Sequence, residues 1–306
     1  MDEVDGYGKR PDFKSQLQAP GNENDIKIGH LRLTEMRQIL HEKGLMLTKS
    51  LGQNFLHDGN ILKKIVSLAK VSSGDKVLEV GPGMGALTGP LLDAGACVFA
   101  LEKDRRLLKY LTTGKFHLHP RFQVSHADAL EYLKLNKFDW AGWKLVSNLP
   151  YSVGSPIIVE LALQEVPPES MTITLQHEVV EKIFSKPGQK NYGLLSILLA
   201  FNYLPKEYFK LPSGCFFPPP DVMSACGLLE VRKHKIYKDS HELLKAAKIA
   251  KLAFQQRRKT LTNSLKSIFP SDQLIEKLNS MGHPSNQRPE KLAPEEFIEL
   301  ARLISI

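Results

Sequence analysis

The sequence predicts an α/β protein with a parallel sheet, followed by a small all-helical domain. Short apolar runs typical of buried strands alternate with helical patterns between residues 76 and 176. Such alternation predicts a sheet whose parallel strands carry helices on both faces. After Val231 the pattern is helical, and the first 28 residues are polar without periodicity. We therefore expect a disordered tail at 1–28, an α/β domain at 29–230 and a helical domain at 231–306.

Each element follows from a local pattern. Thr34 is the expected N-cap of a first helix that ends at Gly44, and helical apolar spacing predicts a second helix around Ile61 to Ala69. The expected strands are 76–80, 97–102, 122–128, 143–148 and 171–176, with helices at 103–113, 129–135 and 157–164. The apolar runs 195–201 and 224–231 predict two late strands. In the last domain we expect helices at 242–268, 272–281 and 294–304.

The positive charge of the chain is concentrated in its helical domain. Residues 231–266 carry a net charge of +9, whereas the whole chain carries +8. Such a basic block indicates a polyanion such as nucleic acid, although a solvated helix face would give the same composition. The candidate phosphate contacts are Lys245, Lys248, Arg257, Arg258 and Lys259, and the side chains expected to face the core are Leu244, Ala247, Phe254, Leu261 and Leu265.

Composition excludes several classes of protein. The cysteines Cys97, Cys215 and Cys226 lack metal-ligand spacing and are expected to be reduced packing residues, and no metal site is expected. No run of about 18 apolar residues predicts a membrane helix. The acidic N-terminus lacks the apolar stretch of a signal peptide. We therefore expect a cytoplasmic protein.

A glycine-rich turn joins the first strand of the sheet to its helix. Gly81, Gly83 and Gly85 occupy this turn, where glycine lets the backbone bend tightly and approach a ligand. Glu102 ends the second strand, where a carboxylate can accept hydrogen bonds from both ribose hydroxyls. This arrangement suits NAD and S-adenosylmethionine equally well, and Glu102 could otherwise be a solvated acid at the end of a strand.

Two more polar residues follow neighbouring strands. Asp128 comes after the third strand, where an acid could accept a hydrogen bond from an adenine amine, and Asn148 ends the fourth. Ligands of open α/β sheets bind at the carboxyl ends of the strands. We therefore expect Glu102, Asp128 and Asn148 to line one crevice, although Asp128 by itself could equally be a helix N-cap.

The stretch Asn148-Leu149-Pro150-Tyr151 predicts a site for a flipped adenine. The side-chain oxygen of Asn148 and the backbone carbonyl of Leu149 could accept hydrogen bonds from the exocyclic amine of the base. Pro150 biases Leu149 towards an extended conformation, and Tyr151 offers a flat face for stacking. The alternative is a loop with an Asx turn and a proline stop.

Together, these motifs resemble the ribosomal RNA adenine dimethyltransferase family, in its bacterial branch. The resemblance runs from about Leu31 to Leu303 and includes 49–56, 176–183, 186–201, 216–225, 253–266 and 287–297. It implies a Rossmann-like seven-stranded class I methyltransferase sheet with a small helical C-terminal domain. It further implies a monomer that uses S-adenosylmethionine to dimethylate N6 of two adjacent adenosines. These would lie in a hairpin near the 3′ end of 16S rRNA, in the assembling 30S subunit.

The resemblance also implies roles for single residues. The implied cofactor contacts are Gln53, Asn54, Leu56, Gly81, Gly83, Glu102, Asp128 and Asn148. Tyr151 and Phe216 would sandwich the target base. This chain departs from the family pattern at three positions, with Asp221 in place of a common Lys, Met223 in place of a common Asp and Lys182 in place of Arg.

Three other functions compete with this interpretation. One is a 23S rRNA methyltransferase of the antibiotic-resistance type, which keeps the chemistry and changes the target. Another is a nucleic-acid-binding factor on the same fold, with catalysis secondary. An NAD oxidoreductase would leave the stretch Asn148 to Tyr151 unexplained. The intact stretch and the three glycines favour catalysis.

Overall fold

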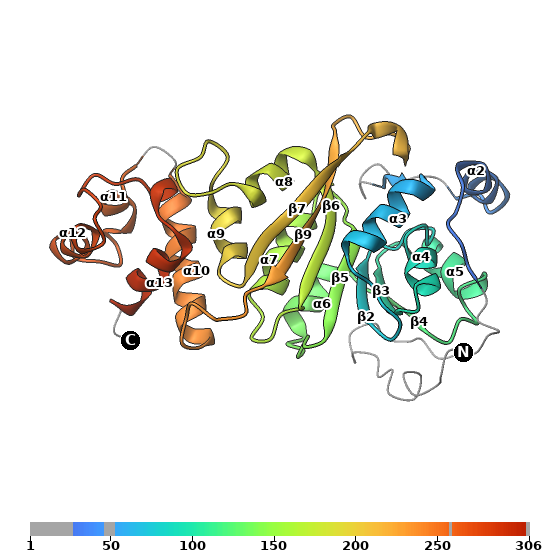
Figure 1. Ribbon diagram of the computed structural model, residues 1–306, viewed down its shortest axis with the longest axis horizontal. Helices are drawn as coiled ribbons and strands as arrows, with labels where there is room; N and C mark the ends of the chain where they lie inside the picture. Colours follow the sequence, from blue (N-terminus) through green and yellow to red (C-terminus); the bar gives the residue numbers. More distant parts are fainter. Residues whose placement is uncertain (1–26, 46–52, 257–258, 304–306) are drawn as a thin grey trace.

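The fold is described from a computed structural model, which places residues 27–45, 53–256 and 259–303. Most of the expected tail at 1–28 therefore lies outside the described residues, as do Arg257 and Arg258. Ile28 is already part of the hydrophobic core, so the expected disorder does not extend to this residue. The molecule is elongated, with the helical domain at one end and helix α2 (Leu33–Glu42) at the other (Figure 1). This first helix begins at Leu33 with Arg32 as its N-cap, rather than at the expected Thr34.

A seven-stranded sheet forms the centre of the α/β part, in the order β4-β3-β2-β5-β6-β9-β7. Strands β2 to β6 are parallel, and the last two pair antiparallel. The bounds of the strands are β2 (Lys76–Val80), β3 (Cys97–Glu102), β4 (Phe122–His126), β5 (Trp143–Asn148), β6 (Ser170–Gln176), β7 (Tyr203–Leu211) and β9 (Ser224–Val231). The predicted parallel sheet is confirmed, within two residues at every strand from β2 to β6.

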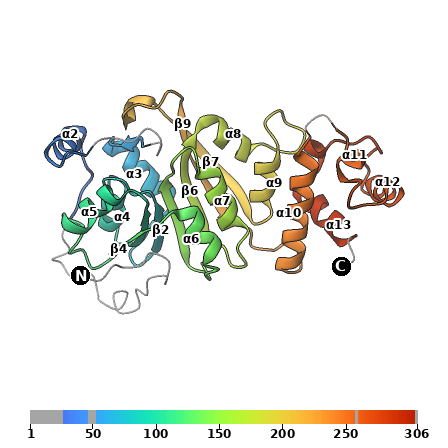
Figure 2. The same ribbon diagram turned by 180° about the vertical axis from the view of Figure 1, so that it is seen from behind.

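Helices cover both faces of the sheet. One core joins Val77 and Val98 to helices α3 (Gly59–Leu68), α4 (Thr88–Asp93) and α5 (Arg105–Thr113). Another joins the adjacent Leu78 and Phe99 to α6 (Ala129–Leu135), α7 (Gly154–Ala162) and α8 (His177–Phe184), and Figure 2 shows α6 and α7 on that side. Successive side chains of a strand point to opposite faces, so strands β2 and β3, which lie between these two cores, carry apolar residues on both faces.

One expected strand is wrong and another was missed. Residues 195–200 belong to a helix, α9 (Leu194–Ala200), with Phe201 as its C-cap, and the seventh strand is β7. Leu199 packs under the sheet while Ile197 packs against the helical domain, so α9 is buried on both sides and has no polar face to reveal its period. Strand β7 is an exposed edge strand with a proline and an irregular register, and its sequence therefore lacks a strand's apolar alternation.

The helical domain consists of α10 (Ser240–Phe254), α11 (Leu261–Leu265), α12 (Ser271–Ser280) and α13 (Pro294–Arg302). The single helix expected at 242–268 is therefore two helices, and Thr260 caps the second of them. The apolar core of the helical domain includes Ile197 and Leu198 of α9. Helix α9 therefore connects the α/β part to the helical domain. Among the described residues, no helix is long and apolar enough to cross a membrane.

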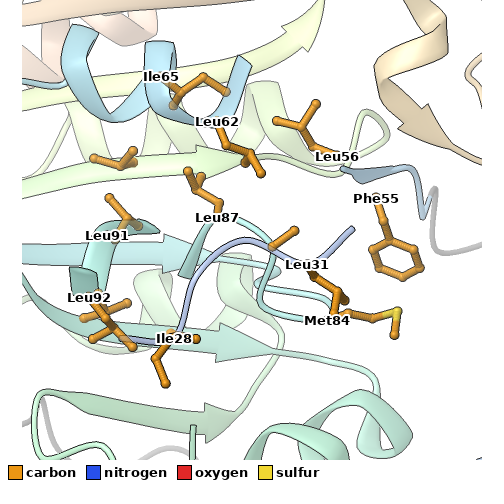
Figure 3. Close-up of a cluster of buried hydrophobic side chains, with 14 of the residues drawn as sticks. Ile28, Leu31, Phe55, Leu56, Leu62, Ile65, Met84, Leu87, Leu91 and Leu92 are labelled. Carbon is orange, nitrogen blue, oxygen red and sulfur yellow. The ribbon is translucent and has the colours of Figure 1, made fainter. Parts of the chain in front are cut away.

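A small second sheet joins two segments that are far apart in the sequence. Strand β1 (Phe55–Leu56) pairs antiparallel with β8 (Phe216–Phe217), so that Phe55 lies opposite Phe217 and Leu56 opposite Phe216. Figure 3 shows Phe55 and Leu56 in the core, with Phe55 beside Met84 of the glycine-rich turn. The small sheet thus holds the segment before β1 against the carboxyl ends of the parallel strands.

Candidate active site

A cavity opens at the carboxyl ends of β2, β3, β4 and β5, where the sequence predicted a crevice. The predicted residues that line it are Gln53, Asn54, Gly81, Gly83, Glu102, Asp128, Asn148, Leu149, Pro150 and Tyr151. Two predicted residues do not line it. Leu56 and Phe216 are buried beside it, each 2% exposed, where they face each other across the small sheet.

The glycine-rich turn allows close approach from two directions. Gly81 and Gly83 have φ angles of +65° and +60°, in the left-handed region that disfavours other residues. A Cβ on Gly83 would lie 2.6 Å from the ring of Phe55, and one on Gly81 would lie 3.5 Å from the ring of Pro150. The backbone of the turn therefore favours glycine at both positions, and packing against Phe55 requires it at Gly83.

Glu102 is a buried carboxylate at the end of β3. It is 5% exposed and accepts hydrogen bonds from the backbone N–H of Gly83 at 3.1 Å and of Asp104 at 2.8 Å. Burial raises the pKa of Glu102 to about 7, although these backbone hydrogen bonds oppose the change. A carboxylate has more lone pairs than these two bonds use, so it can accept further hydroxyl groups from a ligand.

Asp104 lies beside Glu102, and its side chain is hydrogen-bonded by Gln53 and Arg106. Gln53 donates its side-chain amide to Asp104 at 3.1 Å, and Arg106 pairs with the same carboxylate. The hydrogen bonds from Arg106 lower the pKa of Asp104 to about 2, so this acid is ionised beside Glu102.

The side-chain amide of Asn148 has one engaged end and one open end. Its nitrogen donates to the backbone carbonyl of Asn54 at 2.9 Å, which fixes the orientation of the amide because a carbonyl can only accept. Its oxygen is buried and has no hydrogen-bond partner among the described residues. A buried acceptor without a partner is costly in a folded protein. The oxygen is therefore suited to a donor group that a ligand supplies.

Tyr151 is anchored by a residue that the sequence did not single out. Its hydroxyl forms a short hydrogen bond with the hydroxyl of Ser224, which is fully buried at the start of β9. The backbone N–H of Leu149 donates to the backbone carbonyl of Thr174 in β6 at 3.2 Å. This hydrogen bond ties the start of the loop that carries Tyr151 to the sheet. No local pattern marks Ser224, because its partner lies in the turn after β5, 73 residues away in the sequence.

The chain matches the family model of ribosomal RNA adenine dimethylases over residues 44–305. The chain belongs to this family. It is 41% identical to a ribosomal RNA small subunit methyltransferase A from Chlamydia felis, across 84% of this chain and 90% of that protein. It is 36% identical to a protein of the same name from Protochlamydia amoebophila, across 87% and 94%.

Two solved structures show the same fold as this dimethylase-family chain. A dimethyladenosine transferase from Plasmodium falciparum has a TM-score of 0.67 and 22% identity, covering 80% of this chain and 95% of that one. The 23S rRNA methyltransferase ErmE has a TM-score of 0.61 and 26% identity, covering 81% and 98%. The sheet with its helical C-terminal region is therefore a class I methyltransferase fold, as the sequence predicted.

Asp128 is the helix N-cap that the sequence left open, and it also lines the cavity. It caps α6 by accepting from the backbone N–H of Leu130 and Glu131. Its second oxygen pairs with Lys103 at 2.7 Å. Burial alone would raise the pKa of Asp128, but the Lys103 pair and the N-cap bonds lower it overall. In this member of the family, the acid is therefore ionised and fixed in place.

A second buried acid, Glu79, was missed. It lies in β2, is 2% exposed and accepts a hydrogen bond from the hydroxyl of Thr88 at 2.7 Å. Burial raises the pKa of Glu79 to about 8, so this dimethylase-family chain holds it largely protonated at neutral pH. The signal in the sequence was an acid inside an apolar strand, where charged residues are rarely buried without a partner.

Of the five candidate phosphate contacts in the helical domain, three lie within the described residues. Lys248 and Lys259 are exposed and Lys245 is half-buried. The prediction that Leu244 faces the core is wrong, because it is 53% exposed while Leu243 is buried in its place. Leu244 is the exception, because Ala247, Leu261 and Leu265 are buried as predicted and Phe254 is partly buried against the same core.

Proposed function

We propose that this chain transfers methyl groups from S-adenosylmethionine to N6 of adenosines in small-subunit rRNA. The family match supports rRNA adenine dimethylation, and the curated relatives described above are named for the small subunit. The observation that carries the proposal is the buried, unpartnered oxygen of Asn148 at the cavity. An acceptor held in this way is what an exocyclic amine needs when it acts as a nucleophile.

The cavity residues fit the cofactor. Glu102 would accept the ribose hydroxyls, and Asp128 would accept from the adenine amine of the cofactor. The backbone of Gly81 and Gly83 lines the cavity and would pack against the methionine part. Gln53 and Asn54 close the cavity from the segment before β1. When bound, S-adenosylmethionine supplies an electrophilic methyl group on a sulfonium.

The stretch Asn148 to Tyr151 would orient the target amine. The lone pair of an adenine amine is delocalised into the ring, so the nitrogen must become more tetrahedral before it can attack. The side-chain oxygen of Asn148 and the backbone carbonyl of Leu149 would accept hydrogen bonds from the N–H groups of the amine. These hydrogen bonds would favour the tetrahedral geometry of the nitrogen. Tyr151, anchored by Ser224, would stack on the base. No strong base is required, because the methylated ammonium is acidic.

Phe216 was expected to sandwich the target base together with Tyr151, but it does not line the cavity. Its ring is buried in the core, so the predicted stacking against a base would require β8 to move. Phe55 lines the cavity instead, on the neighbouring strand of the same small sheet. We therefore assign the second wall of the base site to Phe55.

The RNA target is two adjacent adenosines in a hairpin loop near the 3′ end of 16S rRNA, in the assembling 30S subunit. The exposed lysines of the helical domain, together with Arg257 and Arg258, would contact its phosphates. The chain would act as a monomer in the cytoplasm. A preference for 23S rRNA is the second candidate, because the structure of ErmE shares this fold.

The test is single-turnover methyl transfer to 16S and 23S rRNA, naked and in ribosomal subunits, with saturating S-adenosylmethionine. Asn148→Ala should slow transfer to the small subunit by roughly 10²–10³, the usual loss for one preorganised hydrogen-bonding group. Binding to the subunit should largely survive. Transfer at the wild-type rate would refute the role of Asn148, and wild-type transfer only to 23S rRNA would favour the second candidate.

Asn136→Ala is a matched control for this test. The side-chain amide of Asn136 also donates to a backbone carbonyl, that of Tyr132 at 2.8 Å, but it lies at the end of α6 and does not line the cavity. This variant loses the same kind of hydrogen bond without touching the site. It should transfer methyl groups at the wild-type rate.

A further inference from the structure

A lysine that the sequence did not single out lies beside the acids assigned to the cofactor. Lys103 follows Glu102 at the end of β3, and both residues line the cavity. The side-chain ammonium of Lys103 donates to Oδ2 of Asp128 at 2.7 Å. Among the described residues that line the cavity, Lys103 alone has a positively charged side chain. The cavity therefore presents a strong hydrogen-bond donor next to the acid that follows the neighbouring strand β4.

Separate contacts fix the positions of this donor and this acceptor. The Oδ1 atom of Asp128 accepts from the backbone N–H of Leu130 at 2.9 Å and of Glu131 at 3.2 Å, so Lys103 pairs with the other oxygen. The backbone carbonyl of Lys103 accepts from Nε2 of His126 at 3.1 Å, which ties it to β4. The donor and the acceptor therefore lie side by side on a backbone that is held in place.

Folding stability does not account for the position of this ion pair. The side chains of Lys103 and Asp128 are 63% and 24% exposed, and pairs this exposed contribute little to stability. A similar pair joins Lys137 to Glu160 at 2.8 Å, with side chains that are 65% and 22% exposed. That pair does not line the cavity. The two pairs are alike in length and exposure, and only the pair of Lys103 is placed to touch a ligand in the cavity.

We infer that Lys103 and Asp128 together read one edge of the cofactor's adenine, with Lys103 donating to the ring nitrogen beside the amine. This inference rests on the proposed function, which places that amine at Asp128. The adenine amine donates, whereas the ring nitrogens N1 and N7 on either side of it accept. An asparagine amide recognises adenine in DNA with the same combination of an acceptor and a donor. The pair offers this combination, because an ammonium has three N–H groups and Asp128 uses one of them.

The test measures binding by calorimetry, with S-adenosylmethionine and with its 1-deaza and 7-deaza analogues, each of which replaces one ring nitrogen by carbon. Wild-type protein should bind one analogue about three- to tenfold more weakly than S-adenosylmethionine, as expected for one hydrogen bond at a partly exposed site. In Lys103→Met this penalty should vanish. Lys103→Arg keeps a donor and should retain part of it. Lys137→Met is the matched control and should behave as the wild type with all three ligands.

The comparison of ligands isolates the hydrogen bond from the charge of the lysine. Loss of the charge in Lys103→Met should change the affinities for all three ligands alike, so only the difference between ligands reports the contact with the ring nitrogen. The analogue whose penalty vanishes in this variant identifies the nitrogen as N1 or N7. The inference is wrong if the wild type binds both analogues as tightly as S-adenosylmethionine, or if Lys103→Met keeps every penalty in full. Either result leaves the proposed function intact, whereas a wild type that does not bind S-adenosylmethionine would overturn both.

Discussion

The two halves of the cavity are built in different ways. The half assigned to the cofactor comes from neighbouring strand–turn units, with Gly81, Gly83 and Glu102 at the ends of β2 and β3. The half assigned to the target base needs segments that are far apart in the chain, since Asn148 is held by Asn54 and Tyr151 by Ser224. The first half depends on local backbone geometry, and the second depends on long-range hydrogen bonds. Variants in one half should therefore leave the other half intact.

The largest expected effect within the cofactor half is that of Glu102→Ala. Two ribose hydroxyls would lose a charged acceptor, which contributes on the order of 1.5–3 kcal/mol. Calorimetry should show S-adenosylmethionine binding weakened by about 10- to 150-fold, while binding of the small subunit stays unchanged. Unchanged cofactor affinity in a folded variant would show that the ribose lies elsewhere.

Gly83→Ala should affect both halves, because the two meet at this residue. An alanine at a φ of +60° costs about 1–2 kcal/mol, and its Cβ would push against the ring of Phe55. We expect a lower midpoint of thermal unfolding and weaker cofactor binding. Gly142→Ala is the matched control, since Gly142 has a φ of +72° and open space around it. It should lose stability to a similar extent or less and keep its cofactor affinity.

The pH dependence should separate the two halves without any substitution. The pKa of Glu102 is raised to about 7, and ribose hydroxyls donate to the ionised carboxylate. Cofactor affinity should therefore be constant above about pH 8 and fall by up to about tenfold per pH unit below 7. Glu102→Gln should bind more weakly and show a flatter profile. If wild-type affinity does not change between pH 6 and 8, the carboxylate does not bind the cofactor in its ionised form.

The smallest expected effect is that of Ser224→Ala, in the target-base half. One hydrogen bond to Tyr151 would be lost, which contributes about 0.5–1.5 kcal/mol. The enzyme concentration for half-maximal transfer should rise by a few fold, with S-adenosylmethionine affinity unchanged. Ser224→Thr keeps the hydroxyl and should retain more of the wild-type behaviour. A loss of cofactor affinity in Ser224→Ala would show that the two halves are coupled.

The sequence by itself determined the elements whose signal is local. Strands β2, β3, β5 and β6 are largely buried and therefore read as mainly apolar runs, whereas β4, at the edge of the sheet, is only partly buried. The positions of Gly81, Gly83, Glu102, Asp128 and Asn148 followed from the rule that parallel strands place their carboxyl ends at one edge. That edge is where the structure places all five.

Only the tertiary structure decided the rest, because the deciding contacts join residues that are distant in the chain. The run Leu194–Ala200 is a helix because it lies between two cores, and no periodicity marks a segment that is buried all round. Phe216 is buried because β8 pairs with β1. Ser224 meets Tyr151 because β9 runs antiparallel beside β6. A pattern of neighbouring residues contains the period of an element, but the partner across a sheet or a domain boundary is fixed only when the chain folds.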